Sequence, residues 1–225
     1  MKYQAIIFDM DGTITDTEQI WHQAFKQLLA RRNITLERTR EQEILNQITG
    51  LGLPEKCLII KKIAGLGDPH ETLAQEKLNT AKALYGDHIK LMDGFPEFYQ
   101  QARQRQLKMG VATNADDETL AITKDKLDLS NFFGKHIYGI SQVNNVGKPN
   151  PAIYLHAARR LQVDPSACIA IEDSAHGINA ARSAGMFCIG LDPTNESSQT
   201  RLADLKVRSY RDIDLDSLLA LDSQA

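Results

Sequence analysis

Three aspartates lie within the segment FDMDGTITDT, directly after the short apolar segment YQAII. If that segment is a strand that continues to Asp11, Asp9 and Asp11 share one face at its C-terminal end. Two carboxylates held close together repel each other unless a cation or a proton lies between them. Mg²⁺, a hard cation that prefers oxygen ligands, would relieve this repulsion. The alternative interpretation is an acidic Asp-Gly turn at the end of a strand.

Polar side chains also follow two later apolar segments. KMGVAT ends at Thr113 and is followed by Asn114, which together offer a hydroxyl, an amide and backbone donors suited to a phosphate. CIAIED ends in Glu172 and Asp173, two adjacent acids that repel each other unless a cation is near. Lys148 precedes a predicted helix and would add a positive charge. A helix cap, a solvated strand end and a surface lysine are the respective alternatives.

The elements that must position these residues form an alternating pattern. Short segments that are apolar on both faces predict parallel strands buried between helices, at 3–8, 108–113, 168–173, 186–191 and, more weakly, 135–140. Helical patterns follow at 96–106, 116–129, 150–163, 175–185 and 212–221. Asp116 is a suitable N-cap, and Gly185 is suited to end a helix. Strands that alternate with helices indicate an α/β domain with a Rossmann-like, mostly parallel sheet.

The first strand interrupts this alternation. Only helical patterns follow it, at 18–33, 37–49, 54–65 and 70–86. Four helices without a strand are too many for one crossover between parallel strands. The sequence therefore predicts an all-helical domain, residues 16–87, inserted into an α/β core of residues 1–15 and 88–225.

Ligands of open parallel sheets bind outside the carboxyl ends of the strands. The three polar clusters directly follow predicted strands, so we expect them to meet at one edge of the sheet. They would bring together acids, a hydroxyl and a lysine. Such a combination of a cation site and an anion site suits a phosphate bound to Mg²⁺.

Four segments, in order and suitably spaced, match the motifs of one known family. FDMDGT matches a first motif, DxDG followed by Thr or Val, and VATN matches an apolar strand ending in Thr or Ser. Lys148-Pro149 matches a lysine that is usually followed by proline, and IEDSAHGINAARSAGM matches EDSxxGxxAAxxAGM. Over nearly its whole length the chain resembles haloacid dehalogenase-superfamily phosphohydrolases with a helical cap.

The resemblance implies roles for the acids. Asp9 would be the nucleophile that forms an aspartyl-phosphate, and Asp11 the general acid and base. Mg²⁺ would be held by Asp9, by the backbone carbonyl of Asp11 and by Asp173, with Glu172 binding it directly or through a neighbour. Dehalogenases lack the second aspartate of the first motif, because a halide leaving group needs no proton. Asp11 therefore favours phosphoryl chemistry.

The resemblance also implies a phosphate site and a closing cap. Thr113 and the backbone of Asn114 would hold the transferring phosphoryl group, and Lys148 would neutralise its charge. A cap over the site implies a small phosphorylated metabolite as substrate, with water excluded on closure. The cap residues Trp21, His22, Thr49 and Gly50 are candidate substrate contacts. A core-facing aromatic for Trp21 and a surface polar residue for His22 are the alternatives.

The favoured function is a Mg²⁺-dependent phosphatase of the sugar-phosphate type, and the main alternative is a β-phosphoglucomutase-type phosphotransferase. Mutases of that type carry a cap-loop arginine that grips a second phosphate, and the corresponding residue here is Leu53. A phosphonate hydrolase would need a cap lysine that forms a Schiff base, and none of Lys56, Lys61 and Lys62 can be placed in the site from sequence. A non-catalytic protein would have lost a catalytic residue, which the motifs do not show.

Composition sets wider limits. The chain has 225 residues, 42% of them hydrophobic, and a net charge of −3, which favours neither nucleic acid nor an anionic membrane as a partner. No apolar segment approaches a membrane span or a secretory signal, and two of the three cysteines fall in predicted strands. We therefore expect a cytoplasmic protein, with a monomer as the default state.

Overall fold

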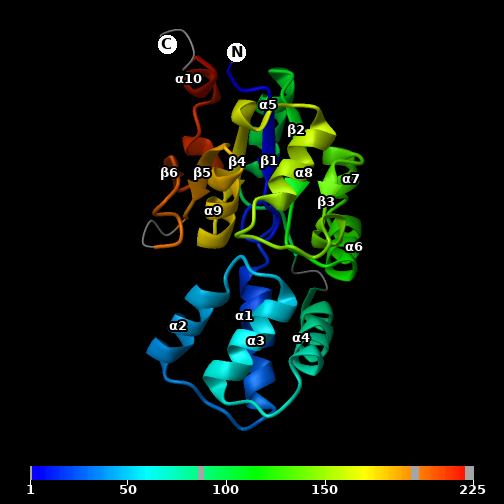
Figure 1. The fold of residues 1–225 in the computed structure, drawn as a ribbon, viewed down its shortest axis with the longest axis vertical. Coiled ribbons are helices and arrows are strands. Elements are labelled where there is room, and N and C mark those ends of the chain that lie inside the picture. Colours follow the sequence, from blue (N-terminus) through cyan, green and yellow to red (C-terminus); the bar gives the residue numbers. More distant parts are fainter. Residues whose placement is uncertain (1, 86–88, 194–197, 221–225) are drawn as a thin grey trace.

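The centre of the molecule is a parallel β-sheet (Figure 1). The computed structural model describes residues 2–85, 89–193 and 198–220. Within them the sheet has six strands in the order β3-β2-β1-β4-β5-β6, and each neighbouring pair is parallel. The strands are β1 (Ala5–Phe8), β2 (Lys108–Ala112), β3 (Ile137–Tyr138), β4 (Cys168–Glu172), β5 (Phe187–Leu191) and β6 (Leu205–Val207). The predicted α/β fold with a Rossmann-like parallel sheet is confirmed.

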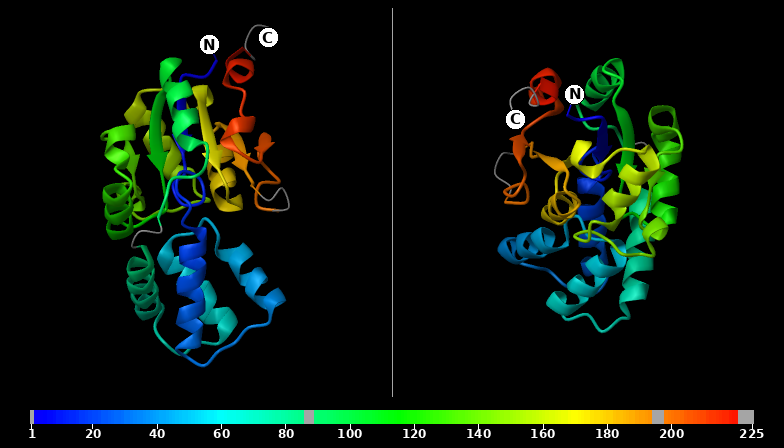
Figure 2. Two further views of the ribbon diagram at one scale, coloured as in Figure 1. Left: turned by 180° about the vertical axis from the view of Figure 1, so that it is seen from behind. Right: turned by 45° about the horizontal axis from the view of Figure 1, so that its top comes forward.

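Helices cover both faces of this sheet, as its doubly apolar strands require. The helices of the core are α5 (Phe95–Gln104), α6 (Asp117–Lys126), α7 (Leu129–Phe133), α8 (Ala152–Leu161), α9 (Ala175–Ser183) and α10 (Leu215–Ala220). Ile6 and Phe8 of β1 pack in one cluster with α5, α7 and α10, whereas Ala5 and Ile7 pack in another with α8 and α9. Figure 2, seen from behind, shows α5 on the face opposite α8. Strand β1 thus lies at the centre of two hydrophobic layers.

Four helices lie together below the sheet edge in Figure 1, and they come from the chain between β1 and β2. They are α1 (Glu18–Ala30), α2 (Arg38–Ile48), α3 (Leu53–Ala64) and α4 (His70–Tyr85). Their buried side chains, such as Phe25, Leu28 and Ile60, form a hydrophobic cluster separate from the two layers of the sheet. This arrangement supports the predicted inserted cap. Its exact limits stay a prediction, and the limit at 87/88 lies outside the described residues.

The predicted elements differ most from the observed ones in three places. The pattern at 116–129 is two helices, α6 and α7, because Asp128 between them has a positive φ of 48°. Strand β6 was not predicted, since three residues at a sheet edge are too short to show a pattern. The helix predicted at 212–221 is α10, which starts at Leu215, and residue 221 lies outside the described residues. None of the described helices is long and apolar enough to cross a membrane.

Candidate active site

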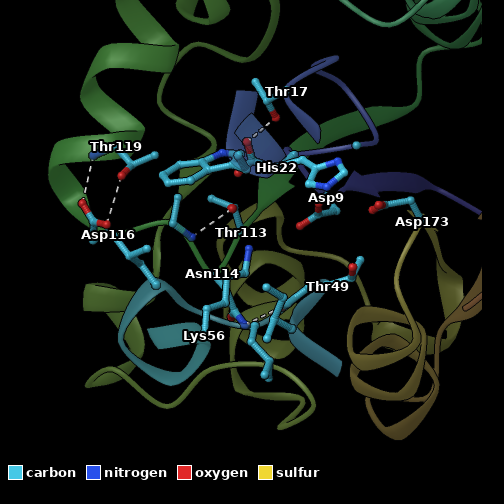
Figure 3. A pocket seen from close by; sticks show the side chains of 18 of the residues that line it. Asp9, Thr17, His22, Thr49, Lys56, Thr113, Asn114, Asp116, Thr119 and Asp173 are labelled. Carbon is cyan, nitrogen blue, oxygen red and sulfur yellow. Dashed lines mark hydrogen bonds between the residues drawn. The ribbon is translucent and has the colours of Figure 1, made fainter. Parts of the chain in front are cut away.

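A pocket lies between the carboxyl-terminal edge of the sheet and the helical cap (Figure 3). Most of the predicted site residues line it, from both sides: Asp9, Asp11, Trp21, His22, Thr49, Gly50, Thr113, Asn114 and Asp173. The remaining two, Lys148 and Glu172, are buried and connect to the pocket through Asp9. The polar clusters that follow β1, β2 and β4 therefore meet at one edge, as strand topology led us to expect.

The loop after β1 holds the two aspartates of the first motif. Strand β1 ends at Phe8, as the predicted segment 3–8 does, so the condition that it continue to Asp11 is not met and the chain turns instead. Gly12 has a φ of 85°, and its N–H donates to Thr15 O at 2.8 Å, which closes this turn. The turn nevertheless leaves both Asp9 and Asp11 on the pocket wall. Thr17 donates to Asp11 Oδ1 at 2.6 Å and thereby orients that carboxylate.

Three acids form a cluster that suits a metal ion. Carboxylate oxygens of Asp9, Glu172 and Asp173 lie within 4.8 Å of one another. Gly12 allows the Asp173 carboxylate to lie close to the first loop, since a Cβ at position 12 would lie 2.3 Å from Asp173 Oδ2. Thr13 donates to Asp173 Oδ1 at 3.2 Å, so the first loop also orients this carboxylate. Oxygen ligands at this spacing fit a hard divalent cation.

Lys148 is the charged partner of the first aspartate. Its ammonium donates to Asp9 Oδ1 at 2.5 Å and to Glu172 Oε1 at 2.6 Å, and the lysine is only 3% exposed. Burial raises the pKa of Asp9 to about 7, although the Lys148 ammonium opposes this shift. Burial also disfavours the charge of Lys148, but Asp9 and Glu172 outweigh it and raise the pKa of the lysine. Lys148 therefore stays charged beside the pocket.

Glu172 is the anchor of this lysine. It is fully buried, and besides Lys148 it accepts from the hydroxyl of Tyr154 at 2.8 Å and from Ser174 Oγ at 3.0 Å. Both of its carboxylate oxygens therefore already accept hydrogen bonds. Gly177 provides the room, because a Cβ there would lie 1.8 Å from Glu172 Oε1. The glycine of the fourth motif thus has a steric role.

Thr113 and Asn114 follow β2 and are almost fully buried, at 2% and 8% exposure. The backbone N–H of Thr113 donates to Tyr138 O at 3.0 Å, which continues the pairing of β2 with β3. Its hydroxyl accepts from the N–H of Ala115 at 3.0 Å, an arrangement in which the hydroxyl hydrogen can donate toward the pocket. Asn114 does not cap a helix. That role belongs to Asp116, as predicted, which accepts from Thr119 N–H at 2.9 Å.

The cap wall carries aromatic, polar and cationic groups. Trp21 and His22 both line the pocket, and His22 Nε2 forms a short hydrogen bond with Glu41. The ammonium groups of Lys77 and Lys56 lie 5.4 and 5.9 Å from the centre of the Trp21 indole. Lys77 is only 2% exposed, and burial lowers its pKa to about 7. The cap therefore brings two amines to the site.

Sequence reasoning missed several of these pocket residues. Lys77 lies in α4, whose sequence pattern is that of an ordinary amphipathic helix, so nothing in the sequence indicated that Lys77 reaches the site. Lys56 could not be placed from the sequence, and the structure puts it on the pocket wall. Thr17, which bonds Asp11, is part of the opening segment and could have been suspected there. Asp116 and Thr119 also line the pocket, at the start of α6.

Comparison with known families identifies the fold and the class. A family model described as haloacid dehalogenase-like hydrolase matches residues 3–185. The chain belongs to the haloacid dehalogenase-like hydrolase family. The resemblance seen in the four motifs is thereby confirmed, and with it the expectation of a hydrolase.

Individual relatives of this family cover most of the chain. A phosphorylated carbohydrates phosphatase of Thermotoga maritima is 28% identical over 81% of this chain and 82% of its own length. The β-phosphoglucomutase of Bacillus subtilis is 28% identical over 96% of this chain and 93% of its own. The crystal structure of CbbY from Rhodobacter sphaeroides in complex with phosphate has a TM-score of 0.77 and 26% identity, and the match covers 93% of this chain and 96% of that one. Phosphatases and a mutase are thus about equally similar to this chain.

Proposed function

We propose that the protein is a Mg²⁺-dependent phosphatase that hydrolyses a small phosphorylated metabolite, such as a sugar phosphate, through an aspartyl-phosphate intermediate. The position of Asp9 carries this proposal. Its carboxylate lines the pocket, contacts the buried ammonium of Lys148 at 2.5 Å and lies beside Asp173. A carboxylate held against a fixed cation at the floor of a pocket is suited to attack a phosphoryl group.

The reaction proceeds in two steps that use Asp9 and Asp11. A carboxylate oxygen of Asp9 forms a bond to phosphorus while the bond from phosphorus to the leaving oxygen breaks, and Asp11 gives that oxygen its proton. Asp11 then accepts a proton from water as the water attacks phosphorus, which releases phosphate and restores Asp9. The hydrogen bond from Thr17 at 2.6 Å keeps Asp11 in one orientation for both steps.

The acidic cluster fits Mg²⁺. Asp9 and Asp173 would hold it with their carboxylates and Asp11 with its backbone carbonyl. Glu172 would act behind them, since both of its oxygens already accept hydrogen bonds from Lys148, Tyr154 and Ser174. When bound, the metal supplies positive charge that offsets the repulsion between carboxylates and phosphate.

The phosphoryl group would be held on its other side by groups that follow β2. The hydroxyl of Thr113 and the backbone N–H of Asn114 offer hydrogen bonds, and Lys148 offers charge. Such preorganised donors favour the transition state because they need no rearrangement when charge develops. The phosphate bound in the structure of the related CbbY supports a phosphate site in this family.

The cap residues that line the pocket would determine the substrate specificity. Trp21, His22, Thr49 and Gly50 line the pocket opposite Asp9, and an indole face with polar neighbours suits a sugar ring. Two further cap residues, Lys56 and Lys77, complicate the choice between phosphatase and mutase. Leu53 lines the pocket in place of the arginine expected of a mutase, but these lysines bring cations to the same wall. The absence of that arginine is therefore weaker evidence against a mutase than the sequence implied.

The nucleophile is tested with p-nitrophenyl phosphate. We expect Mg²⁺-dependent release of phosphate by the native protein and loss of at least about 1,000-fold in the Asp9→Asn variant. Asp16→Asn is the matched control, since Asp16 pairs with Lys90 at 3.1 Å in the exit from the first loop. Robust Mg²⁺-dependent turnover by Asp9→Asn would rule out Asp9 as the nucleophile.

The mutase alternative is tested with β-glucose 1-phosphate and a trace of glucose 1,6-bisphosphate. Net release of free phosphate supports the phosphatase, because a mutase returns the phosphoryl group to the sugar. Glucose 6-phosphate formed without free phosphate would establish the alternative. A panel of phosphorylated metabolites then identifies the substrate. A cytoplasmic location and a monomeric state remain predictions, as does the absence of nucleic acid and membrane partners.

A further inference from the structure

One core side chain connects the cap to the loop that carries the lysine. Asn114 donates through Nδ2 to the carbonyl of Gly50 in the cap at 2.9 Å. The same amide accepts through Oδ1 from the backbone N–H of Lys148 at 2.9 Å, and its Nδ2 lies 3.5 Å from the carbonyl of Lys148. A single amide group therefore holds the backbone of the catalytic lysine and, at the same time, touches the cap.

Glycines on both sides of Asn114 allow this contact. A Cβ at Gly147 would lie 3.1 Å from both side-chain atoms of the Asn114 amide, closer than an unstrained contact. On the cap side, Gly50 has a φ of 78°, and a Cβ there would lie 2.2 Å from Ser174 Oγ. The missing side chain of Gly147 thus lets the lysine loop approach the amide, and that of Gly50 lets the cap loop approach the core beside Ser174.

The two ends of Lys148 are held by different partners. Asp9 and Glu172 hold its ammonium, whereas the Asn114 amide holds its backbone. The ammonium contacts involve core residues alone, so they do not depend on a partner in the cap. The Gly50 contact joins cap to core, so it requires the cap loop to lie against the sheet edge, as it does in this structure.

We propose that the side chain of Asn114 is a positioning residue that makes the placement of Lys148 depend on cap closure. When the cap closes, the bond to the Gly50 carbonyl fixes the amide, and the amide fixes the backbone of the lysine loop. When the cap opens, the amide loses that partner and the loop loses part of its restraint. This role is separate from the backbone N–H of Asn114 and rests on the proposed function only in that Lys148 acts on a phosphoryl group.

Cap closure has a built-in reporter. The chain contains one tryptophan, Trp21, and it lies in α1 of the cap on the wall of the pocket. Its fluorescence should therefore change when inorganic phosphate and Mg²⁺ occupy the site and the cap closes over them. This signal needs no turnover, so it can be read even if the protein proves not to be a phosphatase.

The main experiment replaces Asn114 by leucine, which keeps the shape and removes the hydrogen bonds. We expect the dissociation constant for inorganic phosphate, followed by Trp21 fluorescence in Mg²⁺, to rise about tenfold, as the loss of two modest hydrogen bonds would give. We expect kcat for p-nitrophenyl phosphate to fall by about tenfold or more. Asn114→Ala serves the same purpose if the leucine variant does not fold.

The matched control is another cap-to-core side-chain contact. Gln199 donates to the carbonyl of Asn46 in the cap at 3.0 Å and accepts from Ala175 N–H at 3.1 Å, without touching the lysine loop. Gln199→Leu therefore loosens the cap but not Lys148. We expect its kcat to stay within about twofold of the native value. Equal losses of kcat in Gln199→Leu and Asn114→Leu would overturn the proposal.

A double-mutant cycle tests whether the effect passes through the lysine. In a Lys148→Ala background, Asn114→Leu should weaken phosphate binding by less than about twofold, because the group it positions is gone. A full tenfold effect in that background would overturn the proposal. If the native protein binds phosphate with this pattern but hydrolyses no phosphomonoester, the proposed function fails and the positioning role stands.

Discussion

At the scale of single residues, Lys148, Glu172 and Lys77 are buried charged side chains, and they differ in how the free-energy cost of their burial is offset. Lys148 and Glu172 neutralise each other, and hydrogen bonds satisfy the remaining oxygen of the glutamate. Lys77 has no such partner: only burial, Lys56 and Cys57 affect its pKa, and no described carboxylate pairs with it. A buried cation without a carboxylate partner in the wall of a pocket costs stability and is therefore a candidate for function.

The free-energy cost of burying the Lys77 ammonium predicts that the stability of the protein depends on pH. Its pKa is about 7 in the folded protein, against 10.5 as the ordinary value, so the unfolded chain binds more protons between these two values. Its destabilising effect is complete below pH 7 and shrinks as the pH rises toward 10. We expect Lys77→Met to raise the free energy of unfolding by about 3 kcal/mol at pH 6 and by much less at pH 9.

Denaturant unfolding at the two pH values measures this difference. Lys62→Met, at an exposed position of α3, is the control and should change stability by less than about 0.5 kcal/mol at either pH. A gain for Lys77→Met that is the same at pH 6 and pH 9 would contradict the assignment of a lowered pKa to Lys77.

At the scale of elements, the turn from β4 into α9 decides where the anchor of the lysine lies. Glu172 ends the strand, Ser174 caps the helix by accepting from Gly177 N–H at 3.0 Å, and Gly177 leaves space for the glutamate. The strand end and the helix start therefore form one unit around a buried carboxylate. Any side chain at Gly177 must displace that carboxylate or the helix.

Gly177→Ala is expected to lower both stability and activity. Its Cβ would overlap the Glu172 carboxylate, which costs about 2 kcal/mol or more, and the displaced Glu172 would release Lys148. The control is Gly185→Ala at the end of the same helix, where φ is 81° and no atom lies within 4 Å of an added Cβ. Gly185→Ala should lower the free energy of unfolding by about 1 kcal/mol through backbone strain alone. Thermal unfolding and p-nitrophenyl phosphate turnover separate the two, since only Gly177→Ala should lose kcat.

At the scale of the whole molecule, the main hydrophobic cluster of the cap is separate from the two clusters of the sheet, and a smaller cluster brings Ile20 and Ala81 of the cap against Ile122 of α6. Phe25, Leu28 and Ile60 belong to the cap cluster, whereas β1 joins the two clusters of the sheet. The pocket lies between these bodies, and polar contacts such as Asn114 with Gly50 connect them. Such an arrangement allows the cap to move, or to unfold locally, while the sheet persists.

A cavity in the cap should therefore act locally. Leu28→Ala removes a fully buried side chain and should destabilise α1–α4 by about 2–5 kcal/mol. We expect hydrogen exchange to speed up in these helices while β1, β2 and β4 keep their protection. Leu58→Ala, at a position of α3 that is 52% exposed, should change neither. Equal acceleration of the sheet amides would show that cap and sheet unfold as one unit.

Much of this fold was predictable from local pattern. The strands that precede Asp9, Thr113 and Asp173 are apolar on both faces, and such segments are short and clearly bounded. Strand β6 escaped prediction because its three residues pair on one side only. Strand β1 ends at Phe8, as predicted, and does not continue to Asp11, since hydrogen bonds among Met10, Thr15 and their neighbours hold the turn at Gly12. Local propensity does not reveal where such contacts end a strand.

The sequence by itself determined which residues follow strands, and hence that Asp9, Thr113 and Asp173 meet at one edge. That conclusion needs only strand polarity, which parallel sheets impose on every member. Tertiary structure alone decided that Glu172 anchors Lys148, that Lys77 reaches the pocket and that Asn114 connects Gly50 to the lysine loop. These contacts join segments far apart in the chain, and they arise from how helices pack around the site. No local pattern encodes the distance between such groups.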